Sequence, residues 1–149
     1  MGRTESVELT TLCLLRQGDQ ILLQNRIKND WRGYALPGGH VEPDESIVDA
    51  VIREMKEETG LTVLDPRLCG VKQFPIDGGR YVVFLFVCDR FEGELRSSSE
   101  GEMEWVFRDR LGEYPCVDDL EDLIRVMERD DLSEFLYILE DGNWLSVLK

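Results

Sequence analysis

One segment that reads as a helix with two unlike faces constrains this sequence more than any other feature. In residues 46–59 apolar side chains recur at helical spacing, and Gly60 follows as a typical left-handed cap. Positions three and four residues apart share one side of a helix. The apolar residues therefore form one arc, and Glu54, Glu57 and Glu58 form the arc beside it. The sequence predicts a helix that packs on one face and carries carboxylates on the next.

The crowding of these acids requires an explanation, since like charges at helical spacing cost about 0.2–0.5 kcal/mol per pair. A solvated surface is the ordinary explanation of an acidic run. Here, however, the acids border the buried arc and follow a glycine-rich bend at residues 37–39, whose carbonyls offer further oxygen ligands. Clustered hard oxygens suit Mg²⁺ or Mn²⁺. We therefore expect a cation site, with Arg53 pairing with Glu45 to hold the bend against the helix.

Short apolar runs around this helix predict a sheet. We expect strands at residues 7–15, 21–25, 39–42, 62–64, 69–74, 81–88 and 103–107, and a C-terminal hairpin that turns at Asp141 and Gly142. Apolar residues at helical spacing predict a second helix over residues 116–129. Because the chain shows no repeat, low-complexity segment or linker, we expect residues 1–149 to form one domain.

Composition narrows the partners and the compartment. The formal net charge is −14, from 31 acids against 17 lysines and arginines, so the protein as a whole repels polymeric nucleic acid. No apolar run approaches the roughly 20 residues of a membrane span, and no signal peptide opens the sequence. The four cysteines lack paired spacing, which favours buried free thiols over zinc. We expect a cytoplasmic protein, a monomer or a homodimer, that binds a small ligand.

Residues 39–61 resemble the Nudix box, G-x5-E-x7-R-E-U-x-E-E-x-G-U, in which U is aliphatic or similarly bulky. Gly39, Glu45 and the run from Arg53 to Leu61 match every fixed position. Three further stretches are similar to the MutT-type, 8-oxo-dGTP diphosphatase-like branch: "LLQNR" ending at Arg26, "ALPGGHVE", and "EGELRSSSEGEMEWV". The resemblance covers residues 7–107, and the C-terminal 40 residues are matched less specifically.

The resemblance implies a Nudix fold, an α/β/α sandwich with a mixed sheet, and hydrolysis of a nucleoside diphosphate linked to another group. Carried over by position, the metal ligands are Gly38 through its carbonyl, Glu54, Glu57 and Glu58, and the structural ion pair is Glu45 with Arg53. The candidates for the general base are Glu54, Glu57 and Glu100, with Glu102 a near competitor. Phosphoryl transfer depends mostly on positioning and on cations that neutralise phosphate oxygens, which suits this set.

The residues that contact the substrate follow less directly from the resemblance than the metal ligands do. Arg26 matches a phosphate-contacting arginine of MutT-like proteins, and Trp31 lies where an aromatic could stack on a base or simply pack. We expect Trp105 and Trp144 in the core. His40, without a visible partner, is expected at the surface or behind the ligands.

Three functions remain open. The first is Mg²⁺-dependent hydrolysis of a nucleoside triphosphate, with oxidised dGTP as a candidate, to monophosphate and pyrophosphate. The second is an ADP-ribose or nucleotide-sugar pyrophosphatase, which Pro75, placed 15 residues after Gly60, keeps open, although a proline there also serves to stop a strand. The third is a non-catalytic module that senses nucleotides, against which the intact acids argue. A kinase-type P-loop is excluded, since no G-K-[ST] occurs.

Overall fold

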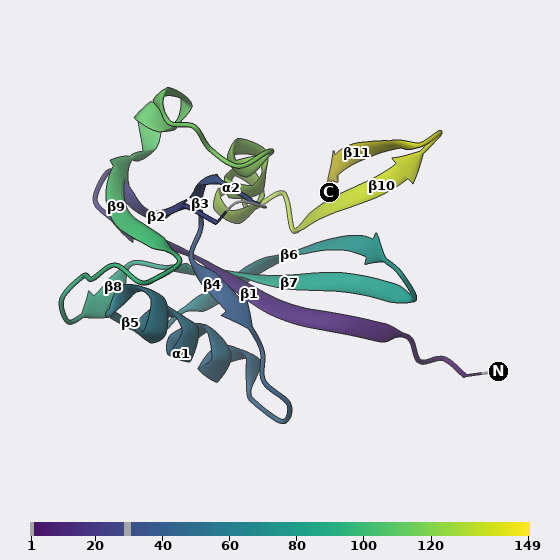
Figure 1. Cartoon of the computed structure of the whole chain (residues 1–149), viewed down its shortest axis with the longest axis horizontal. Coiled ribbons are helices and arrows are strands. Elements are labelled where there is room, and N and C mark those ends of the chain that lie inside the picture. Colours follow the sequence, from purple (N-terminus) through teal and green to yellow (C-terminus); the bar gives the residue numbers. More distant parts are fainter. Residues whose placement is uncertain (1, 29–30) are drawn as a thin grey trace.

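The computed structural model describes residues 2–28 and 31–149, which form a large mixed sheet, a small second sheet and helices on both sides (Figure 1). The strands are β1 (Ser6–Gln17), β2 (Gln20–Arg26), β3 (Gly33–Ala35), β4 (Gly38–His40), β5 (Thr62–Leu64), β6 (Arg67–Ile76), β7 (Gly79–Cys88), β8 (Arg90–Glu92), β9 (Gly101–Phe107), β10 (Glu134–Glu140) and β11 (Asn143–Leu148). The helices are α1 (Ile47–Thr59), α2 (Leu120–Glu128) and the 3-10 helix η1 (Arg108–Glu113).

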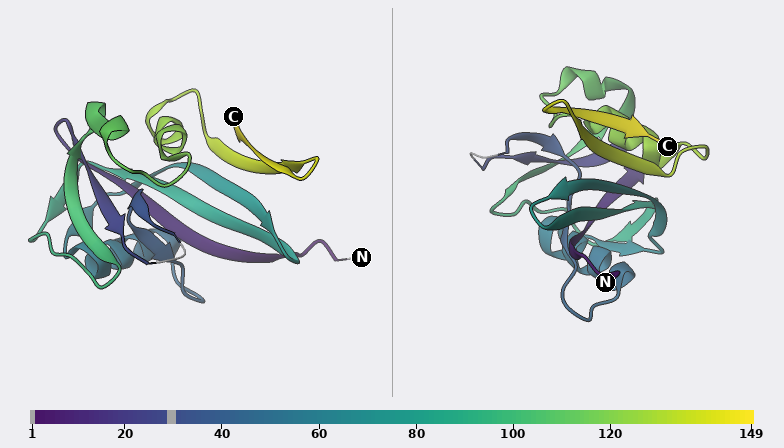
Figure 2. Two further views of the ribbon diagram at one scale, coloured as in Figure 1. Left: turned by 45° about the horizontal axis from the view of Figure 1, so that its top comes forward. Right: turned by 90° about the vertical axis from the view of Figure 1, so that its right-hand side faces the viewer.

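Strand β1 organises the sheet and crosses the length of the molecule (Figure 2). Its residues 6–15 run parallel to β7, while on its other side it pairs antiparallel with β4 and, at its end, with β2. The strand order is β11-β10-β6-β7-β1-β2-β3, with β9 paired to β2, and β5 pairs with β8 in the small sheet. β4 and β2 thus pair with different parts of β1, at residues 10–12 and 16–17. The functional groups described below lie near the point where one pairing ends and the other begins.

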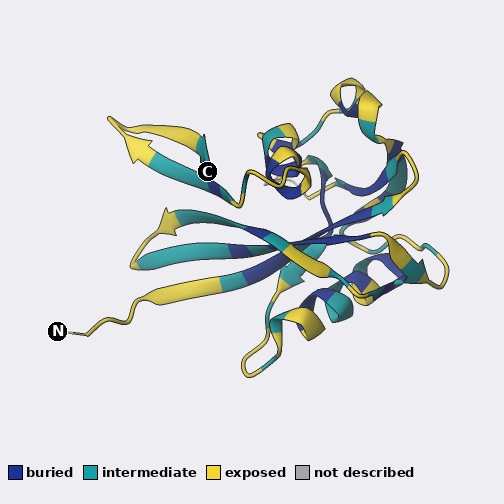
Figure 3. Ribbon diagram, turned by 180° about the vertical axis from the view of Figure 1, so that it is seen from behind, coloured by how far each residue is buried: buried dark blue, intermediate teal, exposed yellow. Residues whose placement is uncertain are grey.

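Alternation along β1 divides the core into two layers. Successive side chains of a strand point to opposite faces, and Leu14 joins one buried cluster while Cys13 and Leu15 join the other. Helix α1 buries Val51 and Met55 against the second cluster, and α2 packs on the first. The sheet therefore lies between two helices, which confirms the expected α/β/α arrangement with a mixed sheet (Figures 1 and 3). Each fully buried Leu or Met side chain contributes about 1.5–3 kcal/mol to stability.

Helix α1 begins and ends as the sequence predicts. The Ser46 side chain accepts a hydrogen bond from the Asp49 amide at 3.2 Å and caps the first turn. Gly60 follows the last turn at a φ of 81°, and its amide donates to the Lys56 carbonyl. A left-handed residue here favours glycine, because glycine has no Cβ to clash. These two caps fix the length of α1 and the positions of the carboxylates on its second arc.

The second helix is shorter than expected, because its predicted first turn instead forms a bridge to Tyr34 at Cys116 and a turn that ends with Asp119 at a φ of 63°. Helix was predicted for residues 116–129, but α2 starts at Leu120. The Val117 amide donates to the Tyr34 carbonyl at 3.0 Å, and the Tyr34 amide donates to the Pro115 carbonyl at 3.0 Å. These bonds to β3 occupy backbone groups that a helical turn would need, so the helix begins only after the contact.

Strands β6 and β7 extend beyond their predicted limits of 69–74 and 81–88. Pro75, expected as a strand stop, lies within β6 opposite Arg80. Its place is explained by β10, which pairs with β6 only as far as Gln73. Beyond that point β6 is an edge, where a residue without an amide hydrogen is tolerated.

The C-terminal hairpin is confirmed, but one of its side chains is not where it was expected. β10 and β11 are antiparallel and are joined by Asp141 and Gly142, both at positive φ. Trp144 was predicted in the core and is instead 54% exposed, because it lies on the edge strand of the sheet and belongs to neither buried cluster. Trp105 is half-buried and stacks on Phe91 with ring centroids 5.5 Å apart.

Candidate active site

A cavity of about 550 Å³ lies where α1, β4 and the central strands meet. Its walls come from α1 and from β1, β2, β4, β6 and β7, and the connecting loops add Trp31, Leu36, Glu42 and Glu100. Two parts of the lining differ in character. The acidic end consists of Gly38, Gly39, Glu54, Glu58 and Glu100. The aromatic end consists of Lys72, Phe74, Tyr81 and Val83.

The glycine bend of β4 brings the backbone close to both β1 and α1. A Cβ on Gly38 would lie 2.1 Å from the Thr11 carbonyl oxygen, and a Cβ on Gly39 would lie 2.4 Å from the Glu54 carboxylate carbon. Hydrogen-bonded positions alternate along an antiparallel pair, and Gly39 lies opposite Thr11 at such a position. The neighbouring Gly38 carbonyl is therefore directed away from β1. The absence of a Cβ at Gly38 lets the bend pass the β1 backbone, and its absence at Gly39 leaves room for the Glu54 carboxylate.

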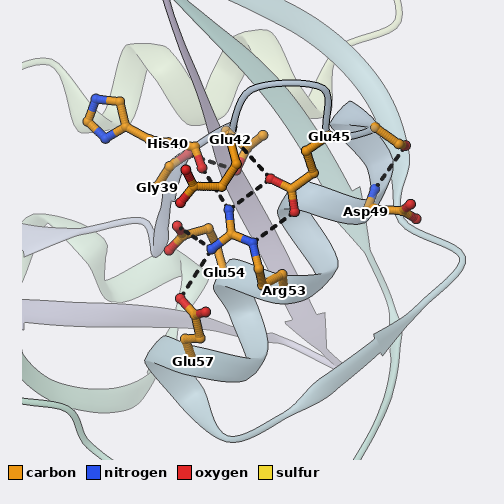
Figure 4. A network of polar contacts seen from close by, with 10 residues as sticks. Gly39, His40, Glu42, Glu45, Asp49, Arg53, Glu54 and Glu57 are labelled. Atoms are coloured by element: carbon orange, nitrogen blue, oxygen red, sulfur yellow. Dashed lines mark hydrogen bonds and ion pairs between the residues drawn. The ribbon is translucent and has the colours of Figure 1, made fainter.

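Arg53 ties the loop before α1 to the helix (Figure 4). Its Nε and Nη2 donate to the two oxygens of Glu45 at 2.8 and 2.9 Å, and Nη2 also donates to the His40 carbonyl at 2.9 Å. The Arg53 hydrogen bonds, followed by one from the Glu42 amide, lower the pKa of the Glu45 carboxyl to about 2. The structure thus places Glu45 and Arg53 in direct contact, and through His40 they fix the end of the glycine bend.

The same guanidinium reaches two of the acids expected to bind metal. Arg53 Nη1 donates to Glu54 at 3.0 Å and to Glu57 at 3.2 Å. The two acids differ in burial, since the Glu54 side chain is 14% exposed and the Glu57 side chain 59%. Burial raises the pKa of Glu54, although Arg53 opposes the shift. Glu54 therefore lines the cavity, whereas Glu57 lies outside its lining.

Glu58 lies deeper and contacts a second carboxylate. Gln24 Nε2 donates to Glu58 at 3.1 Å, and Lys28 Nζ lies 3.1 Å from Glu100. Burial, followed by the hydrogen bond with Glu100, raises the pKa of Glu58 well above its ordinary value. The Lys28 ammonium group, in contrast, lowers the pKa of Glu100. Two carboxylates in contact favour a shared positive charge between them, either a proton or a cation.

The two residues expected to bind substrate contact each other at the rim of the cavity. Arg26 Nε donates to the Trp31 carbonyl at 3.2 Å, and its guanidinium lies 4.5 Å from the centre of the Trp31 ring. Trp31 remains 46% exposed. Exposure of this kind leaves a face of the ring accessible to a ligand, and the guanidinium is held in the cavity by both contacts.

Two other predicted positions lie at the surface. His40 is exposed, and its Nε2 lies 2.7 Å from a Glu8 oxygen, which agrees with the surface position expected for it. Glu102, the competitor of Glu100, is exposed on β9 and does not line the cavity.

Sequence reasoning missed the buried Gln24 and the whole aromatic end. Gln24 had a usable signal, because it is a polar residue inside the apolar run of β2, and it is only 1% exposed. The aromatic end had none. Lys72 and Phe74 reach the cavity because they lie opposite Val83 and Tyr81 in the β6–β7 pair, and that register is not visible in either strand alone.

The donor chemistry at the acidic end fits a hard divalent cation, because it consists of carboxylate and carbonyl oxygens. Within the described residues, no three His, Cys, Asp or Glu side chains are grouped closely enough to hold a metal ion as they stand. The hydrogen bonds of Arg53 explain part of this, since they hold Glu54 and Glu57 toward the guanidinium. A cation at this end would draw carboxylates away from Arg53 while Glu45 keeps its two bonds.

Comparison with known proteins identifies the fold. The family profile described as NUDIX domain matches residues 8–130. The chain belongs to the Nudix hydrolase family. A crystal structure of a MutT protein from Bacillus halodurans superposes with a TM-score of 0.77 at 33% identity, and the match covers 95% of this chain and 97% of that one. The resemblance to MutT-type Nudix proteins and the expected Nudix fold are thereby confirmed.

Two relatives of similar sequence differ in whether an activity is assigned to them. An uncharacterized Nudix hydrolase of Bacillus subtilis, YvcI, is 37% identical over 105 residues, which are 66% of this chain and 65% of that protein. The ADP-ribose pyrophosphatase of Methanocaldococcus jannaschii is 37% identical over 92 residues, 60% of this chain and 54% of that protein. The match thus spans less than two thirds of either relative. Among the described residues, no helix is long and apolar enough to cross a membrane.

Proposed function

We propose that the chain hydrolyses a nucleoside triphosphate to nucleoside monophosphate and pyrophosphate, with Mg²⁺ as cofactor and Mn²⁺ as a substitute. The observation that supports this most is the acidic end. Glu54, Glu58 and Glu100 gather there beside the glycine bend, in a cavity that also contains Arg26. The combination provides oxygen ligands for a cation and a guanidinium for a phosphate within one site.

The proposed cation site consists of Glu54, Glu58 and the Gly38 carbonyl, with Glu57 joining after its side chain leaves Arg53. When bound, Mg²⁺ neutralises phosphate oxygens and makes water more acidic. The chain's own part is to position these oxygens. Gly39 supports this, because its missing Cβ is what lets the Glu54 carboxylate lie against the bend.

Two further groups act on the substrate and on the attacking water. Arg26 faces the cavity and is held by Trp31, so it binds a phosphate without a large loss of side-chain freedom. The proton of the attacking water goes to a carboxylate of the cavity. Glu54 and Glu100 are the candidates that line it, whereas Glu57 does not. Lys28 holds Glu100 in place by an ion pair.

A substrate panel with product identification tests this proposal. Nucleoside triphosphates with and without oxidised bases are incubated with Mg²⁺, and the products are separated by phosphorus NMR. Attack at the β phosphorus predicts monophosphate and pyrophosphate. Orthophosphate and a nucleoside diphosphate as first products would contradict the proposal.

The second candidate is hydrolysis of ADP-ribose or a nucleotide sugar. It is favoured by the likeness to the Methanocaldococcus jannaschii enzyme and by the size of the cavity, whose aromatic end offers room beyond the acidic end. Faster turnover of ADP-ribose than of every triphosphate in the same panel would establish it. A nucleotide-sensing module without catalysis is disfavoured, because the carboxylates of the box are intact.

A further inference from the structure

The aromatic end of the cavity contains a lysine whose ammonium group lies among aromatic rings. Lys72 lies on β6 and lines the cavity. Across residues 2–28 and 31–149, no hydrogen bond or ion pair engages its ammonium group. The group lies instead 5.4–5.8 Å from the ring centres of three aromatic side chains: Phe74, Phe135 and Tyr137.

The rings attract the charge of Lys72, but they supply no acceptor that would replace its lost hydration. Burial lowers the pKa of Lys72, and the charge of Asp119 opposes the shift only in part. The carboxylate of Asp119 already accepts a hydrogen bond from the Tyr137 hydroxyl. A partly buried charge without a charged partner destabilises a fold, and such exceptions are typical of functional positions. A ligand group that accepts a hydrogen bond would complete the bonding of the ammonium group.

The walls beside Lys72 suit a flat ring better than a phosphate. Phe74 and Tyr81 are cross-strand neighbours whose rings stack at 4.9 Å with an interplanar angle of 12°. Val83 and Leu12 add apolar surface to the same lining. A phosphate is strongly hydrated and fits the acidic end, where a cation would offset its charge, whereas a nucleobase loses little on entering apolar walls.

We propose that Lys72 determines specificity by donating a hydrogen bond from its ammonium group to a carbonyl oxygen of the substrate's base. An ammonium group only donates, so it is satisfied by the carbonyl of guanine or of an oxidised purine. Adenine carries an amino group, itself a donor, where guanine carries its 6-carbonyl. The inference rests on the proposed function, because it places the triphosphate at the acidic end and the base at the aromatic end.

The substitution Lys72→Met tests the proposal, because methionine keeps an apolar stem and removes the donor. The control is Lys149→Met, at an exposed lysine outside the cavity. For each protein kcat/KM is measured with dGTP and dATP, and binding of dGMP and dAMP is measured by calorimetry with Mg²⁺. We expect the wild type and Lys149→Met to prefer guanine by about tenfold or more, and Lys72→Met to lose the preference through weaker guanine binding.

Stability provides a second readout. Thermal unfolding of Lys72→Met is expected at or above the wild-type temperature, because a partly buried charge is removed. A clear drop in that temperature would make Lys72 a structural residue and overturn the proposal. Lys72→Arg keeps donors at this position and is expected to retain part of the guanine preference.

Failure of this inference is distinguishable from failure of the proposed function. If no triphosphate is hydrolysed, the binding of the two monophosphates still reports on Lys72. The same guanine preference in wild type and Lys72→Met would overturn the inference even if hydrolysis is confirmed. So would a wild type that binds dGMP no better than dAMP.

Discussion

Replacing Gly39 by alanine tests whether catalysis depends on the position of the Glu54 carboxylate against the glycine bend. The new Cβ would lie 2.4 Å from the Glu54 carboxylate carbon and one of its oxygens, whereas ordinary contact begins at 3.4 Å. The carboxylate must therefore move by about 1 Å. A displacement of this size in a positioning group costs about 100-fold in rate.

The fold should tolerate the same change. Gly39 is not among the residues at positive φ, and the atoms in its way belong to the end of a flexible side chain. Alanine in a compatible conformation also restricts the unfolded chain, which stabilises by about 0.4–1 kcal/mol. We expect a melting temperature within about 4 °C of the wild type, since 1 kcal/mol corresponds to about 2–4 °C at this size.

The assay is kcat with saturating substrate and Mg²⁺, beside a thermal melt. Gly112→Ala is the matched control, because nothing lies within 4 Å of its new Cβ and the residue is in η1, away from the cavity. Gly38→Ala gives the contrast, since its Cβ would meet the Thr11 carbonyl at 2.1 Å and should lower the melting temperature sharply. A Gly39→Ala protein with wild-type kcat would refute the role given to the bend.

Further predictions follow from the carboxylates and from Arg53. Glu58→Gln and Glu54→Gln should lower kcat about a thousandfold with the fold intact, and Glu57→Gln less, because Glu57 lies outside the cavity lining; wild-type rates in all three variants would show that these acids form only a solvated face. Excess chelator should abolish hydrolysis and added Mg²⁺ restore it, so full activity in chelator would remove the cation from the proposal. Arg53→Ala should lower melting temperature and activity together, because Glu45 and the His40 carbonyl lose their donor; a stable but inactive variant would instead make Arg53 a substrate contact. Glu45→Gln should make the free energy of unfolding depend less on pH at acidic pH. The folded pKa of Glu45 is lowered to about 2, so its contribution is complete above the unfolded pKa of about 4.3 and is lost as pH falls toward 2; the stability difference between wild type and Glu45→Gln, measured by denaturant titration from pH 7 to 2, should shrink in that window.

The sequence predicted what depends on local spacing. The caps and the two arcs of α1 follow from residues within a few turns of one another, and the contact between Arg53 and Glu45 joins residues of one short segment. The expected C-terminal hairpin is also local, since its turn residues stand between its strands. All four cysteines are free, as their spacing indicated, but only Cys13 and Cys88 are buried, while Cys69 and Cys116 are half-buried.

What the sequence did not predict depends on pairing between distant segments. Residues 116–119 are not helical, because Pro115 and Val117 bond to the backbone of Tyr34, far away in sequence, and a turn follows before α2. Trp144 is exposed because its strand, β11, is at the edge of the sheet. That position depends on the order of the strands and cannot be inferred from the residues next to Trp144 in the sequence. Likewise Lys72 lines the cavity only because the register of β6 and β7 places it opposite Val83. The compartment, the assembly state and the extent of the domain stay predictions.

The parallel pairing of β1 with β7 also sets an order of events in synthesis. Residues 6–15 are synthesised before their partner, residues 79–88, which follows only after helix α1 and the five strands β2 to β6 have been made. At about 5–20 residues per second this takes several seconds. Until then one side of β1 has no partner, and Leu14 and Leu15, buried in the finished protein, have no complete core to enter. The strand that organises the fold is thus the one that a chaperone would most usefully cover in the nascent chain.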